Sequence, residues 1–210
     1  MSKKVFGRGV RCGEALFLAA AVVMLLGALW LEREQTALSD SVLRLHVLAN
    51  SDEQADQELK LKVRDRVLEE ADAILADGLT LEETKKQLAE NLARLAEAGA
   101  EAVAEEGYDY SVSASIEQTW FPTKEYQDFS LPAGEYQALR IVIGEGLGRN
   151  WWCVVYPPLC MGAVSESAAD VAANAGMADK QVGLLVGETD GYVIKFKALE
   201  LWDRIKLAFS

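Results

Sequence analysis

Few side chains in this chain could do chemistry, because its 210 residues include one histidine and three cysteines. No C-x-x-C or H-E-x-x-H motif accompanies His46, so the sequence predicts no metal site and no cofactor. A dyad of His46 with Cys153 or Cys160 stays open as an alternative, which would make the chain a thiol hydrolase that acts on the cell wall. Neither cysteine lies in a known nucleophile signature, so we expect no catalytic residues.

Polar side chains at the end of a predicted strand are better candidates for binding another protein. Residues 42–49 alternate in part, with Arg44 and His46 on the more polar side, and Asn50 and Asp52 follow directly. We interpret these four as surface residues that contact a partner. Asp56 and Lys60 come one helical turn apart, which is typical of an ion pair on a solvated helix face.

Two adjacent tryptophans form the second candidate for partner binding. Trp151 and Trp152 lie in a predicted strand, where successive side chains point to opposite faces. Both therefore cannot be buried in one core, and exposed tryptophan is a favoured binding anchor. The alternative, that other elements cover both faces, stays open.

A glycine-rich segment precedes these tryptophans. Gly144-x-Gly-x-Gly148 lacks the following helix that a nucleotide-binding fingerprint requires, because a strand-like run follows it. We interpret it as the hairpin turn between strands 135–143 and 151–156. Cys153 and Cys160 beyond it could form a disulfide or remain two buried thiols.

The elements that must position these residues follow from hydrophobic periodicity. Ser51 with Gln54 suggests a capping box for a helix that reaches about residue 76. Thr80 with Glu83 suggests a second one, for a helix that reaches about residue 106, so the two helices should form an antiparallel hairpin. Residues 108–120 alternate strictly and predict a half-exposed strand, whereas residues 121–134 predict an ordered loop. Residues 165–177 predict a short helix and 198–208 a last helix, while 192–197 fit either a strand or the beginning of that last helix.

This order of elements predicts an α+β fold. We expect a mostly antiparallel sheet, with the helical hairpin and the C-terminal helix packed on one face. A transmembrane or signal helix should precede that domain, since four basic residues stand before the apolar run Ala15–Leu31. We therefore expect a signal peptide or membrane anchor at 1–31, a linker at 32–41 and an exported domain at 42–210.

Net charge limits the partners of the exported part. Residues 1–31 hold four of the 21 basic and one of the 33 acidic residues, which leaves 17 basic and 32 acidic residues and a net charge of −15. A surface this acidic argues against nucleic acid as a partner. The sequence also suggests no small-molecule substrate.

Several long motifs resemble one known family. They are Arg44-Leu-His-Val-Leu-Ala-Asn-Ser-Asp52, Gln57-Glu-Leu-Lys-Leu-Lys-Val-Arg-Asp65, Phe121-Pro-Thr-Lys-Glu-Tyr126, Leu131-Pro-Ala-Gly-Glu-Tyr136, Val142-Ile-Gly-Glu-Gly146 and Asn150-Trp-Trp-Cys-Val-Val-Tyr-Pro-Pro-Leu-Cys160. Together they resemble the stage II sporulation protein R family of endospore-forming bacteria.

That resemblance implies a signalling protein rather than an enzyme. Members of this family are exported from the forespore into the space between the forespore and mother-cell membranes. There they activate a membrane-embedded aspartic protease that processes pro-sigma-E. The family carries over no catalytic residue to this sequence. The resemblance leaves two forms open, one secreted and one held in the membrane by residues 15–31.

Overall fold

The computed structural model describes the backbone of residues 3–76, 78–126, 128–159 and 167–186. The chain divides into two compact units, Met1–Ala37 and Leu38–Ser210, and the boundary falls inside the predicted linker. Helix α1 spans Lys3–Ser39 and makes up the described part of the first unit. Its apolar side chains from Leu16 to Leu26 are mostly exposed.

Within the described residues, no helix combines the length and the apolar character that crossing a bilayer requires. The role of residues 1–31 as a signal peptide or an anchor stays a prediction.

The second unit is built on a four-stranded sheet in the order β2-β5-β1-β6. These strands are β1 (Leu43–Leu48), β2 (Val112–Phe121), β5 (Gly134–Ile143) and β6 (Asn150–Tyr156). Strand β1 runs parallel to β5 and antiparallel to β6, and β2 is antiparallel to β5. The predicted α+β fold with a mostly antiparallel sheet is confirmed.

The predicted hairpin between β5 and β6 is wrong. These two strands are not neighbours, because β1 lies between them and pairs with both. Six residues, 144–149, therefore cross the carboxyl end of β1 to connect strands on either side of it. Every residue of β1 is buried, as expected for a central strand covered on both faces.

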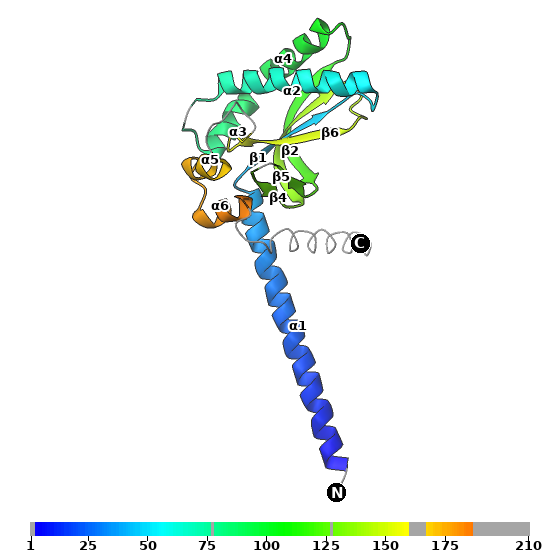
Figure 1. The fold of residues 1–210 in the computed structure, drawn as a ribbon, viewed down its shortest axis with the longest axis vertical. Helices are drawn as coiled ribbons and strands as arrows, with labels where there is room; N and C mark the ends of the chain where they lie inside the picture. Colours follow the sequence, from blue (N-terminus) through cyan, green and yellow to red (C-terminus); the bar gives the residue numbers. More distant parts are fainter. Residues whose placement is uncertain (1–2, 77, 127, 160–166, 187–210) are drawn as a thin grey trace. The chain divides into compact units, whose positions relative to one another are not determined.

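One face of the sheet packs against helices α2 (Gln54–Ile74), α3 (Leu81–Glu90) and α4 (Leu92–Glu105), with α2 and α4 crossing above the strands in Figure 1. The spacing of Leu59, Val63, Val67, Ala71 and Ile74 predicts the inner side of α2; the first four are buried and Ile74 is half-buried. Ion pairs such as Lys62–Glu106 and Arg66–Glu105 show that α2 and α4 run antiparallel. The capping box at Thr80 is confirmed, but the predicted helix over 80–106 is two helices that meet at Asn91.

The other face is also covered, which corrects the expectation of helices on one face only. Residues predicted as a loop contain a small hairpin of β3 (Lys124–Glu125) and β4 (Ser130–Leu131). Helices α5 (Ala168–Asn174) and α6 (Asp179–Val186) join it, and their apolar side chains pack with the second core cluster of the sheet. The elements predicted over 192–208, including the C-terminal helix, lie outside the described residues.

Candidate functional site

The crossing segment 144–149 meets the end of β1 and the start of α2, and we call this meeting point the β1–α2 junction (residues 49–60 and 144–149). Asn50 connects its two chain segments. Its Oδ1 accepts a hydrogen bond from the Glu145 N–H at 3.0 Å, and its backbone oxygen accepts one from the Leu147 N–H at 3.1 Å. Asn50 therefore positions the crossing segment, and its side-chain oxygen already has a hydrogen-bond partner within the protein.

Asp56 anchors the same junction from the first turn of α2. One carboxylate oxygen accepts hydrogen bonds from Ser51 Oγ at 2.6 Å and Asn50 Nδ2 at 2.9 Å. The hydrogen bond from Ser51 lowers the pKa of Asp56 most, with further contributions from Asn50 and Tyr110. The predicted Ser51–Gln54 capping box is wrong, because Glu53 is the N-cap residue and Ser51 donates to Asp56 instead.

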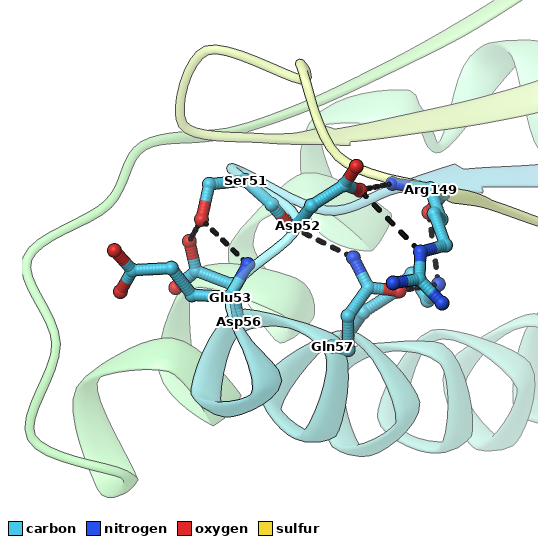
Figure 2. Close-up of polar contacts among 7 residues, drawn as sticks. Ser51, Asp52, Glu53, Asp56, Gln57 and Arg149 are labelled. Carbon is cyan, nitrogen blue, oxygen red and sulfur yellow. Dashed lines mark hydrogen bonds and ion pairs between the residues drawn. The ribbon is translucent and has the colours of Figure 1, made fainter.

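Three more polar side chains fasten the junction, as Figure 2 shows for Asp52 and Gln57. Asp52 Oδ1 accepts from the Arg149 N–H at 2.8 Å, and Gln57 Nε2 donates to the Ser51 oxygen at 2.8 Å. Lys60 Nζ donates to Gln57 Oε1 at 2.7 Å and to the Arg149 oxygen at 2.8 Å. Lys60 and Asp56 are both buried with other partners, so the ion pair predicted between them is not formed.

Burial lowers the pKa of the Lys60 ammonium, and the charge of Arg149 lowers it further. The nearby carboxylate of Asp52 acts in the opposite direction.

Glycines allow the crossing segment to lie this close to β1. A Cβ on Gly148 would lie 2.1 Å from the Ser51 oxygen, and one on Gly144 would lie 2.3 Å from Asn50 Oδ1. Gly144 also has a φ of +56°, a conformation that other residues rarely adopt. Gly148 therefore allows a close approach to the backbone of Ser51, and Gly144 leaves room for the side chain of Asn50.

Arg44 and His46 share one face of β1 as predicted, but both are buried, so their interpretation as surface residues is wrong. Arg44 Nη2 donates to the Tyr126 hydroxyl at 3.0 Å, and its guanidinium lies 4.0 Å from the ring centroid of Phe121 and 4.9 Å from that of Tyr136. No described carboxylate pairs with it, and Nε and Nη1 have no hydrogen-bond partner within the part of the chain that the structure describes. Burial lowers the pKa of this guanidinium.

His46 Nε2 lies 2.8 Å from Asn150 Oδ1 and donates its proton to that amide oxygen. Its ring contacts Phe121 and Trp152 on the same face of the sheet. Burial lowers the pKa of His46, and the guanidinium of Arg140 adds to that effect. His46 is thus a neutral core histidine rather than an exposed contact.

The two tryptophans point to opposite faces, as predicted. Trp151 packs on the helix-covered face, where the Arg64 guanidinium lies 4.6 Å from its ring centroid. Trp152 packs on the other face with Phe121. Both are half-buried, whereas Trp120 of β2 is 47% exposed.

Cys153 is disulfide-bonded, and Cys160 lies outside the described residues. Cys153 pairs in register with Leu45 and belongs to the core on the helix-covered face. His46 pairs with Trp152 and points to the opposite face, so Cys153 and His46 cannot form a dyad. Among the described residues, no group of three or more His, Cys, Asp or Glu side chains could hold a metal ion.

Sequence reasoning missed the residues that complete the junction, namely Asp56, Gln57, Lys60, Leu147 and Arg149. The signal was present in two motifs far apart in the chain, one around Asn50-Ser51-Asp52 and one at Gly144–Gly148. Only the insertion of β1 between β5 and β6 brings those motifs together.

Comparison with known proteins places the junction inside one family. The family model described as stage II sporulation protein R matches residues 39–166, a range that includes the six strands of the described residues and both segments of the junction. The stage II sporulation protein R of Bacillus subtilis (strain 168) is 39% identical over 129 residues, which cover 61% of this chain and 58% of that relative. No solved structure matches. The chain therefore belongs to the stage II sporulation protein R family.

Proposed function

We propose that this chain is an exported sporulation signal that activates a membrane-embedded aspartic protease and so starts the processing of pro-sigma-E. Family membership supports a role in sporulation. The individual steps of the proposed function are taken from what the family resemblance implies. They are export to the space between the forespore and mother-cell membranes, contact with the protease, and precursor cleavage.

The observation that carries a binding role is the β1–α2 junction. Two segments almost 100 residues apart are held together by an extensive hydrogen-bond network, and the outer side chains Asp52 and Arg149 stay 65% and 75% exposed. A surface that is ordered before contact loses little conformational entropy on binding. We propose that Asp52 contacts the protease directly, whereas Asn50 positions the surface.

The other residues predicted to bind the partner take different roles in this proposal. Arg44 and His46 are buried and support the sheet from within. Trp151 and Trp152 are half-buried and lie within β6, the strand that follows the junction. The alternative function, a thiol hydrolase, cannot use Cys153 and His46 as its catalytic dyad, because these side chains lie on opposite faces of the sheet.

Export is supported by the four basic residues and by the apolar side chains exposed on α1. We propose that residues 1–31 deliver the second unit across a membrane, as a cleaved signal or as an anchor. Amino-terminal sequencing of the exported form distinguishes the two, since a cleaved form begins after the apolar run.

Reconstitution in a bacterium that does not sporulate tests the proposal. The full chain, the protease and the sigma-factor precursor are co-expressed, and precursor cleavage is followed by immunoblot. We expect cleavage to require the chain, and we expect the double variant Val22→Lys, Leu25→Lys to abolish it by blocking export. An exported, folded chain that leaves the precursor intact would contradict the proposal.

A further inference from the structure

Leu147 lies at the tip of the crossing segment and is 76% exposed, more than any other large apolar side chain among the described residues. Isolated exposed apolar residues are common on protein surfaces. What distinguishes Leu147 is the backbone that carries it.

The backbone around Leu147 is fixed at every residue. From Gly144 to Arg149, all six consecutive N–H groups donate hydrogen bonds. Their acceptors are, in order, Ser111 O, Asn50 Oδ1, Ile143 O, Asn50 O, Ala49 O and Asp52 Oδ1, at 2.8 to 3.1 Å. A loop held in this way cannot fold its tip residue back onto the protein. The exposure of Leu147 is therefore a property of an ordered conformation.

The close packing of this segment depends on glycines. A Cβ on Gly146 would lie 2.6 Å from Val142 Cγ1, and the Cβ positions of Gly144 and Gly148 are blocked as well. Leu147 thus stands between two glycines, so neither adjacent residue has a side chain that could cover it.

A charged side chain, Arg149, follows two residues after Leu147. Arg149 is 75% exposed, and among the described residues its guanidinium makes one ion pair, from Nε to Asp52 Oδ1 at 3.8 Å. The same Asp52 oxygen already accepts the Arg149 N–H. The outer guanidinium nitrogens face solvent and could reach an acidic group on a partner. An apolar centre with a charged rim is the usual composition of a protein–protein contact.

We propose that Leu147 inserts into an apolar pocket on the extracytoplasmic part of the protease, and that an acidic group on the rim of that pocket pairs with Arg149. This inference rests on the proposed function and deepens it by naming the contact. Burying one leucine side chain corresponds to roughly a 10-fold to 100-fold change in a binding constant.

Variants of the full chain test the contact. Leu147→Ser should weaken binding to the purified protease at least about 10-fold and reduce precursor cleavage. Its unfolding midpoint in urea should stay unchanged, because the side chain is mostly exposed. Leu147→Met should restore binding. The matched control is Leu61→Ser on α2, which changes another exposed leucine (39%) and should leave binding intact.

The charge on the rim is tested separately. Arg149→Glu should weaken binding more than Arg149→Gln does, and the difference between them should shrink at high salt. If these two variants bind equally well, the proposed pairing of Arg149 with an acidic group on the protease is wrong.

Failure of this inference differs from failure of the proposed function. Wild-type chain that neither binds the protease nor triggers cleavage contradicts both. If wild-type chain does both and Leu147→Ser matches it within twofold, the function stands and the contact at Leu147 is wrong. An equal loss of protease binding in Leu61→Ser would also overturn the contact, since it would indicate nonspecific apolar adhesion.

Discussion

Replacing Gly148 with alanine should destabilise the second unit through the β1–α2 junction alone. The new Cβ would lie 2.1 Å from the Ser51 oxygen, 2.6 Å from the Ser51 carbonyl carbon and 2.8 Å from the Cβ of buried Ala49. Two of these atoms belong to the backbone and the third to a fully buried residue. The crossing segment must therefore move away from β1.

The size of the effect follows from the hydrogen bonds that would break. The three nearest are Leu147 N to Asn50 O at 3.1 Å, Gly148 N to Ala49 O at 2.9 Å and Arg149 N to Asp52 Oδ1 at 2.8 Å. Each contributes about 1 kcal/mol net. If all three are lost, the free energy of unfolding falls by about 3 kcal/mol, and partial relaxation gives about 2 kcal/mol.

Urea unfolding of the full chain, followed by tryptophan fluorescence, measures this loss as a lower midpoint at constant slope. Gly183→Ala is the matched control, because it makes the same substitution in α6 with nothing within 4 Å of the new Cβ. Alanine is the better helix former, so this control should gain up to about 1 kcal/mol.

The reasoning would be refuted if Gly148→Ala lost less than about 0.5 kcal/mol while retaining slow hydrogen exchange at the amides of residues 147–149. That result would mean that the segment accommodates a Cβ without leaving β1.

Three further predictions concern buried polar groups. Burial is the main cause that lowers the pKa of His46 in the folded state, so the folded protein binds fewer protons than the unfolded protein does. The free energy of unfolding should therefore fall as the pH drops below about 6.5. His46→Gln should lack that slope in urea midpoints between pH 7 and 5.5, and equal slopes would contradict the idea. Arg44→Met should leave the unfolding free energy equal or raise it by about 1 kcal/mol, because it removes a buried charge; a loss above about 2 kcal/mol would point to an anionic partner. Asp56→Ala should cost about 2–4 kcal/mol at pH 7 by unpairing Ser51 and Asn50, which a midpoint equal to wild type would disprove.

Local patterns in the sequence determined most of the elements. The spacing of Leu59, Val63, Val67, Ala71 and Ile74 predicts the inner side of α2, because residues about four apart share a helix face, and all but the half-buried Ile74 are buried. The capping box of Thr80 was predicted because both of its partners lie within one turn. These features depend on neighbours along the chain, so the sequence alone reveals them.

Burial of polar side chains could not be predicted in this way. Arg44 and His46 have side chains that favour water, and strand alternation places them on one face without saying what covers it. The hairpin of β3 and β4 and the helices α5 and α6 form the layer beside that face. Phe121 and Tyr136 supply rings on which the guanidinium stacks, which offsets part of the cost of burying it.

The candidate site also combines features that local sequence predicts with features that depend on the tertiary structure. Local motifs single out Asn50, Asp52 and the glycines of 144–148, and the same motifs carry the resemblance to one family. Their meeting in one junction depends on the fold of the whole domain, because a short connection favours a hairpin and nothing local indicates that β1 separates β5 from β6. That pairing is set by burial of β1 on both faces, a property of the whole domain.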